Sequence, residues 1–263
     1  MTTSPSGAPE RSVVDRTLSI LGAFDRDNRT LTLSDISRRS GLPVATVHRI
    51  VNKLTGWGAL ERCSDGGYSI GLRLWETAVL APRSSSLAET AQPYLVELHR
   101  QTSVGATLAI RDGVESVCLS VMTNQADLAE LYTHPGGRLP LHASSVGLVL
   151  LAHAGESVRS AICAGPLSAY TTATITDGAA LGRCLVRVRR EGHALVHGML
   201  TEGWGGLAVP VRDSRGAVVA AVGAVGRVDL IQPVRLLPHV RAAAEAIARS
   251  ARPNGLRDAE VGT

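Results

Sequence analysis

The clearest periodic pattern in this 263-residue chain lies between residues 43 and 58, where hydrophobic positions recur at the spacing of one helix face. The residues that share this face are Val47, Ile50, Val51 and Leu54. The opposite face is polar and basic, and it carries Thr46, His48, Arg49, Asn52 and Lys53. Pro43 is typical of a helix start and Gly58 of a helix end, so the pattern predicts an amphipathic helix with one basic surface.

Two further helices and a hairpin are predicted around this basic helix. Residues 12–24 repeat hydrophobic side chains at helical spacing, and we expect Val14, Leu18 and Leu21 to form their inner face. A second helix is expected to begin at an N-cap on Thr32 or Ser34 and to end at Gly41. Residues 60–64 and 68–71 flank Asp65-Gly66-Gly67, which favours a tight hairpin. Three helices and a hairpin are the layout of a winged helix-turn-helix.

Charge is distributed unevenly along this region. Residues 36–60 contain four Arg or Lys residues and no Asp or Glu, although the whole chain has a net charge of only +4. A local basic surface on a short helix favours contact with nucleic acid. The alternative is a solvated helical bundle whose charges only keep it soluble.

The second half of the chain mixes strand and helix periods. Residues 105–121 form two apolar runs about an Asp112-Gly113 turn, which predicts a hairpin. Helices are predicted at 87–101, 143–152, 156–164, 177–192 and 234–250, and strands at 193–199, 205–213 and 217–226. This mixture predicts an α+β domain built on an antiparallel sheet.

Several classes of protein are disfavoured by the sequence. The four cysteines form no CxxC pair and no Cys/His ligand spacing, so we expect no metal site, no disulfide framework and a reducing, cytoplasmic location. No apolar run approaches the length of a membrane helix. The GxSxG, GxxxxGK[ST], HExxH and strand-following GxGxxG motifs of common enzymes are absent, and no cofactor is expected.

Four stretches carry a resemblance to a known family. They are "LTLSDISRRSGLPVATVHRIVNKLTGWGALER", "YSIGLRLWETA", "LPLHASSVGLVLLA" and "GGLAVPVRDSRGAVVAAVGAVG". Together they make residues 12–250 resemble the IclR family of transcriptional regulators. The resemblance implies a homodimer or homotetramer that binds an inverted-repeat operator in double-stranded DNA and responds to a small-molecule effector.

The resemblance also implies a domain order. We expect a disordered tail over residues 1–9, a winged helix-turn-helix domain over 10–71 and a linker helix over 72–86. A GAF-like effector-binding domain is expected over 87–252 and a second disordered tail over 253–263.

Candidate DNA contacts follow from the same resemblance. Ala45 and Thr46 stand where the family's recognition helix begins, and His48 and Arg49 keep its His-Arg pair. The predicted DNA-binding residues are Arg38, Ala45, Thr46, His48, Arg49, Asn52, Lys53 and Arg62, with Arg62 in the wing.

Candidate effector contacts are expected around the third and fourth of these stretches. They are His142, Ser144, Ser145, Leu148, His197, Met199, Trp204, Gly223 and Val225. Leu148, Gly223 and Val225 depart from the family, because Lys is common at the first position and serine occurs at the other two. So few polar groups favour an uncharged or aromatic ligand over a very small acid. His142 and Met199 could equally be ordinary core residues.

The expected function is therefore that of a transcriptional regulator, a repressor rather than an activator, whose effector could be a small aromatic acid or derivative. Two alternatives stay open. One is a ligand-sensing module that acts through protein partners, and the other is a small-molecule enzyme whose catalytic residues are scattered in the sequence.

Overall fold

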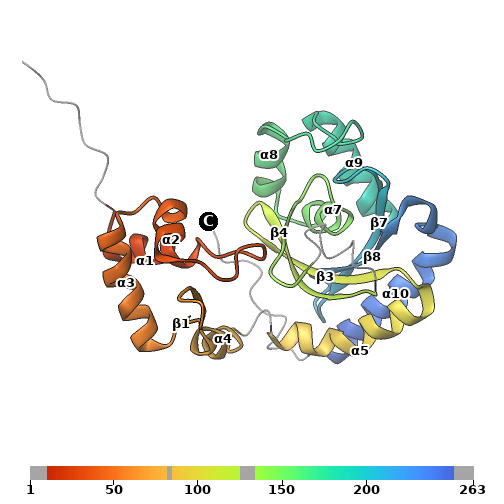
Figure 1. Ribbon diagram of the computed structural model, residues 1–263. Coiled ribbons are helices and arrows are strands. Elements are labelled where there is room, and N and C mark those ends of the chain that lie inside the picture. The colour runs from red at the N-terminus through yellow and green to blue at the C-terminus, as the bar shows by residue number, and fades with distance from the viewer. Residues whose placement is uncertain (1–10, 82–84, 125–133, 252–263) are drawn as a thin grey trace, which may run out of the picture. The chain divides into compact units, whose positions relative to one another are not determined.

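The computed structural model describes residues 11–81, 85–124 and 134–251 (Figure 1). The chain divides into two compact units, Met1–Ala81 and Pro82–Thr263, and this division lies inside the predicted linker helix. The tails expected over residues 1–9 and 253–263 lie outside the described residues.

The first unit consists of three helices, a hairpin and a short fourth helix. These elements are α1 (Val13–Leu21), α2 (Leu33–Ser40), α3 (Val44–Trp57), β1 (Leu60–Arg62), β2 (Tyr68–Ile70) and α4 (Leu72–Ala78). The strands β1 and β2 pair antiparallel, and Leu31 forms a bridge to Tyr68 that attaches the wing to the start of α2. The winged helix-turn-helix predicted from the sequence is confirmed.

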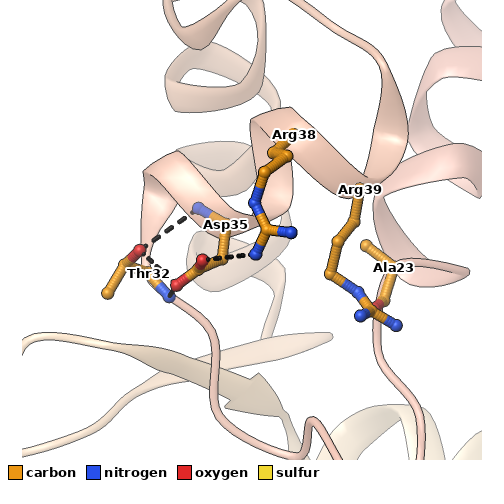
Figure 2. Close-up of polar contacts among 5 residues, drawn as sticks. All are labelled: Ala23, Thr32, Asp35, Arg38 and Arg39. Atoms are coloured by element: carbon orange, nitrogen blue, oxygen red, sulfur yellow. Dashed lines mark hydrogen bonds and ion pairs between the residues drawn. The ribbon is translucent and has the colours of Figure 1, made fainter.

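Capping interactions determine where the first two helices begin. The Ser12 hydroxyl accepts from the Asp15 N–H, and the Thr32 hydroxyl accepts from the Asp35 N–H. In each case the carboxylate accepts in return from the N–H of the capping residue, which satisfies donors that a helix start leaves free. Figure 2 shows this arrangement at Thr32 and Asp35. Of the two N-caps considered for α2, Thr32 is the one used.

The inner face of α3 is as predicted, but that of α1 is not. Val47 and Val51 are fully buried, whereas Val14 and Leu18 of α1 are exposed and Ile20 is fully buried instead. Hydrophobic residues occur on two sides of α1, and the packing of this unit covers only the side that contains Ile20. Leu21, the third residue predicted for this face, is half-buried against the same core, so helical spacing was right for Leu21 and wrong for Val14 and Leu18.

The second unit is a six-stranded antiparallel sheet with helices on both faces. Its strands, in the order β5-β4-β3-β8-β7-β6, are β5 (Arg138–Pro140), β4 (Glu115–Met122), β3 (Gly105–Asp112), β8 (Val218–Arg227), β7 (Trp204–Arg212) and β6 (Ala194–His197). The helices are α5 (Ser85–Thr102), α7 (Ser145–Ala152), α8 (Glu156–Ala164), α9 (Gly178–Glu191) and α10 (Pro233–Ser250), with a short 3-10 turn, η1 (Val228–Leu230), before α10. The predicted α+β class is confirmed, and among the described strands of this unit β5, a short edge strand, was not predicted.

Successive side chains of each strand point to opposite faces of the sheet, so the sheet has a separate hydrophobic core on each face. Leu207 and Val222 pack against α5 and α10 on one face of the sheet, whereas Ala208 and Ala221 pack against α7 and α9 on the other. Figure 1 shows α10 and α5 on one side of the strands, with α7, α8 and α9 on the other. The small residues Ala208 and Ala221 let α7 approach the sheet closely. Every residue of α7 is buried.

Three further findings concern the described residues as a group. All four cysteines are free thiols. Within the described ranges, no helix is long and apolar enough to cross a membrane. No group of three or more His, Cys, Asp or Glu side chains in these ranges is placed to hold a metal ion.

Candidate functional sites

The outer face of α3 presents the basic and polar side chains expected there. His48, Arg49, Asn52 and Lys53 are exposed on this helix, and Arg62 is exposed on β1 of the wing. The side chains of His48 and Asn52, one turn apart, lie 3.4 Å from each other between Nε2 and Nδ2. Thr46 is half-buried beside them and Ala45 is exposed. The face is a continuous polar surface one helix long.

The start of α3 differs from the starts of α1 and α2. Its N-cap is Pro43, no side chain caps it, and its first turn carries no acidic residue. Its first N–H groups therefore stay open to solvent at the positive end of the helix dipole. A helix start of this kind favours an anion such as a phosphate group.

The two arginines at the end of α2 have different surroundings (Figure 2). Arg38 is mostly exposed and forms an ion pair with Asp35 at 2.9 Å. The Thr32 hydroxyl and the Arg38 guanidinium together hold the pKa of Asp35 below its ordinary range. Arg39 donates to the carbonyl of Ala23 at 2.6 Å and pairs with Asp25, so it anchors the α1–α2 connection. Of these two, Arg38 has the more exposed side chain.

The second unit contains a cavity between the first turn of α7 and the β6–β7 end of the sheet. It encloses about 560 Å³ of empty space when the solvent at its open mouth is counted. The residues that line it are Thr107, Leu139, Ala143, Ser144, Ser145, Val146, Val196, Met199, Leu200, Thr201, Trp204, Gly205, Gly206 and Val225. No charged side chain is among them.

The polar side chains of this lining divide into two groups. The Ser144 hydroxyl donates to the carbonyl of Pro140 and accepts from the N–H of Gly147, so it is used as the N-cap of α7. Thr107 is likewise engaged, since its hydroxyl donates to the carbonyl of Ser120. Ser145 is 8% exposed, and its hydroxyl has no hydrogen-bond partner among the described residues. Because Ser145 lines the cavity, this hydroxyl is available to a ligand that enters it.

Backbone donors lie beside this hydroxyl. Ser145 and Val146 are the first two residues of α7, and their N–H groups find no acceptor within the described part of the chain. They stand at the positive end of the helix dipole. Two N–H groups and one hydroxyl therefore lie together on the α7 side of the cavity.

Five of the nine residues predicted for the effector site line this cavity: Ser144, Ser145, Met199, Trp204 and Val225. The other four lie elsewhere. His142 is buried and its Nε2 lies 2.9 Å from the carbonyl oxygen of Ser168. Leu148 is 1% exposed within the core beneath α7 and α9, because only the first turn of α7 reaches the cavity.

His197 and Gly223 do not line the cavity, for two different reasons. On β6, Val196 lines the cavity and the next residue, His197, points to the opposite, exposed side. Gly223 is covered, since a Cβ there would lie 3.0 Å from Val146 and 3.2 Å from Thr107.

Nine lining residues were not predicted from the sequence. Val196 was noted only as a departure from the family. Gly205 and Gly206 carry a local signal, because paired glycines in a strand indicate a close approach. A Cβ at Gly206 would lie 2.6 Å from the Ser145 hydroxyl.

A winged helix-turn-helix followed by an antiparallel-sheet domain defines a DNA-binding transcriptional regulator. Residues 13–63 match the model of the IclR helix-turn-helix domain, and residues 80–249 match that of the bacterial transcriptional regulator IclR C-terminal domain. The chain belongs to the IclR family, whose members are regulators and not enzymes.

Three relatives illustrate the similarity. The HTH-type transcriptional regulator XynR of Escherichia coli K12 is 31% identical, over 90% of this chain and 96% of XynR. The HTH-type transcriptional repressor AllR of Klebsiella pneumoniae is 27% identical, over 89% of this chain and 86% of AllR. The crystal structure of an IclR homolog from Microbacterium hydrocarbonoxydans, complexed with 4-hydroxybenzoate, is 34% identical with a TM-score of 0.86, over 92% of this chain and 99% of that one.

Proposed function

We propose that this protein is a cytoplasmic repressor that binds an inverted-repeat operator through α3 and the wing, and that a small molecule in the cavity changes its affinity for that operator. The single observation that carries the ligand part is the unpartnered Ser145 hydroxyl beside the open N–H groups of α7. The basic outer face of α3 supports the DNA part.

Within this proposal, Arg49 and Lys53 contact phosphates or bases from α3, Arg62 contacts the backbone from the wing, and the uncapped start of α3 receives a phosphate. Arg38 can contact DNA only when its ion pair with Asp35 opens, or when its guanidinium binds a phosphate while it keeps that ion pair. Because phosphate contacts displace counterions, operator affinity is expected to fall steeply with salt.

The proposed effector has a ring or short apolar body and one polar head, such as a benzoate derivative, an amide or a hydrazide. Apolar side chains including Leu139, Met199 and Val225 surround the body, while Ser145 and the start of α7 receive the head. Among the described lining residues there is no arginine or lysine to neutralise a second charge. Binding of 4-hydroxybenzoate by the related Microbacterium protein agrees with this ligand class.

The protein is further proposed to act as a homodimer or homotetramer, held partly by α4. Leu72, Trp75, Val79 and Leu80 are exposed at helical spacing on this short segment. A two-fold pair of subunits matches the symmetry of an inverted repeat. Light scattering at micromolar concentration should return twice or four times the 27.5 kDa of one chain, and a value near 27.5 kDa would contradict the proposal.

One experiment tests the central proposal. Genomic fragments bound by the purified protein are sequenced to obtain the operator. Thermal unfolding is then compared in 4-hydroxybenzoate, benzamide, pyruvate and glyoxylate. A ligand at a hundredfold excess over Kd stabilises the folded state by about 2.7 kcal/mol, which a thermal shift detects. Stabilisation by pyruvate or glyoxylate with none by the aromatic compounds would contradict the proposed ligand class.

A further inference from the structure

The start of α4 is attached directly to the end of α3, although 14 residues of wing separate the two helices. In Figure 1, α4 lies beside β1. The contact is made by Gly71, Leu72 and Arg73 on one side and by residues from Trp57 to Glu61 on the other.

Two backbone N–H groups make the first set of contacts between the start of α4 and the segment that follows α3. The N–H of Gly71 donates to the carbonyl of Ala59 at 2.8 Å, and the N–H of Leu72 donates to the Glu61 carboxylate at 2.8 Å. Gly71 is buried so tightly that a Cβ there would lie 2.3 Å from the carbonyl oxygen of Gly58. The backbones of the two segments are therefore in contact.

Arg73 makes the second set of contacts. Its guanidinium lies over the Trp57 ring, 4.6 Å from Cζ to the centroid, and its Nη1 donates to the Trp57 carbonyl at 3.1 Å. This carbonyl belongs to the last turn of α3, where helix carbonyls lack intrahelical donors and the dipole is negative. Arg73 of α4 thus donates to a free carbonyl at the end of α3, places a positive charge at the negative end of the helix dipole and stacks on the Trp57 ring.

These contacts make α3 and the start of α4 a single rigid piece. The outer side of α4 carries the exposed Leu72 and Trp75, the face proposed above to pair with a second copy of the chain. If two copies pair there, the direction of each α4 determines how far apart and at what angle the two α3 helices stand.

We infer that Arg73 is a positioning residue that determines which half-site spacing the protein accepts in its operator. This inference rests on the proposed binding of an inverted repeat by a dimer. Without the Arg73–Trp57 contact, α3 is expected to pivot about the Gly58 and Gly71 backbones, and the dimer is expected to tolerate operators of altered spacing. Arg73 acts through α3 and itself contacts no base.

The test uses the full chain and the operator recovered from the bound genomic fragments, with one or two base pairs inserted at the centre of symmetry. Each inserted pair moves one half-site by about 3.4 Å and turns it by about 35°. The wild type is expected to lose about tenfold or more in affinity per inserted pair. Arg73→Gln is expected to lose about threefold or less, and Arg73→Lys, which keeps a donor, an intermediate amount.

Arg49→Ala is the matched control, because it should weaken binding to every spacing by the same factor and leave the insertion penalty unchanged. Circular dichroism and thermal unfolding establish that each variant is folded. The inference is overturned if Arg73→Gln shows the wild-type insertion penalty, whatever its overall affinity, or if the wild type itself accepts all spacings equally. A wild type that binds no duplex at all overturns the proposed function, and this inference with it.

Discussion

The hydroxyl of Ser145 faces the backbone of Gly206 so closely that a Cβ at position 206 would lie 2.6 Å from it. Both residues line the cavity, so a methyl group on β7 would fill the space beside the open donors of α7. The absence of a side chain at 206 is therefore part of the shape of the proposed effector site.

Gly206→Ala is expected to weaken binding of an aromatic effector such as 4-hydroxybenzoate by about tenfold or more, because the added methyl group displaces the Ser145 hydroxyl. Gly182→Ala on α9 is the control, since a Cβ there meets nothing within 4 Å and alanine favours a helix. Isothermal titration calorimetry measures both. Unchanged affinity in Gly206→Ala would exclude this part of the cavity as the ligand site.

Ser144 and Ser145 are adjacent serines with separable roles. Ser144→Ala removes the N-cap of α7 and is expected to lower the free energy of unfolding by about 1 kcal/mol. Ser145→Ala removes no hydrogen bond within the described protein, so stability should change by less than about 0.5 kcal/mol while effector affinity falls about fivefold to tenfold. Urea unfolding with and without ligand separates the two effects. Equal effects of both substitutions on ligand affinity would argue against a direct contact by Ser145.

Arg49 lies on the exposed face of α3, where we expect a contact to phosphate or base. Arg49→Ala should weaken operator binding by about 1–3 kcal/mol and, if the contact is to phosphate, reduce the slope of log affinity against log salt by about one. Arg215→Ala, in the exposed β7–β8 turn of the other unit, removes the same charge and should change neither. Gel-shift titrations at several salt concentrations measure both quantities. Tight, wild-type-like binding by a folded Arg49→Ala protein would show that α3 docks differently.

Thr55 is the one residue, among those the structure describes, whose side chain holds a buried polar atom without a hydrogen-bond partner. A buried hydroxyl without a partner costs about 1–3 kcal/mol, and valine has nearly the same shape without the hydroxyl. Thr55→Val is therefore expected to raise the free energy of unfolding of the first unit by about 1 kcal/mol. Thermal unfolding of the full chain measures it, and a lower melting temperature would show that the hydroxyl has a partner in solution.

His153 makes stability depend on pH. Burial lowers its pKa from the ordinary value of 6.5, with further lowering from the charges of Arg212, Arg189 and Arg159. The folded state therefore keeps His153 neutral while the unfolded chain binds a proton, so the free energy of unfolding falls as pH drops from about 6.5 to the lowered pKa. Above pH 6.5 this contribution is constant.

His153→Gln is expected to flatten this part of the pH profile. Urea unfolding midpoints at pH 7.0, 6.0 and 5.0 compare the two proteins. Parallel profiles for wild type and variant would mean that other groups carry the dependence.

Much of the fold follows from local patterns. Helical spacing in residues 43–58 predicted α3 and its buried face, and the Asp112-Gly113 turn predicted the β3–β4 hairpin. These signals work because a helix or hairpin is determined by neighbours within a few residues. The same kind of signal failed on α1, where two hydrophobic sides were available and only packing against α2 and α3 decided between Ile20 and Leu18.

The sequence by itself determined the winged helix-turn-helix and the basic face of α3, because these depend on short-range spacing and charge, and its four family-like stretches predicted the class of protein. The position of the cavity and the residues that line it depend on the tertiary structure alone. Its wall joins Thr107 from β3, Ser145 from α7 and Val225 from β8, which are far apart in the chain and meet only through the strand order of the sheet. Whether a side chain lines such a space depends on which way it points once distant elements pack. Leu148 and His197 therefore matched the expected stretches and still lie outside the cavity.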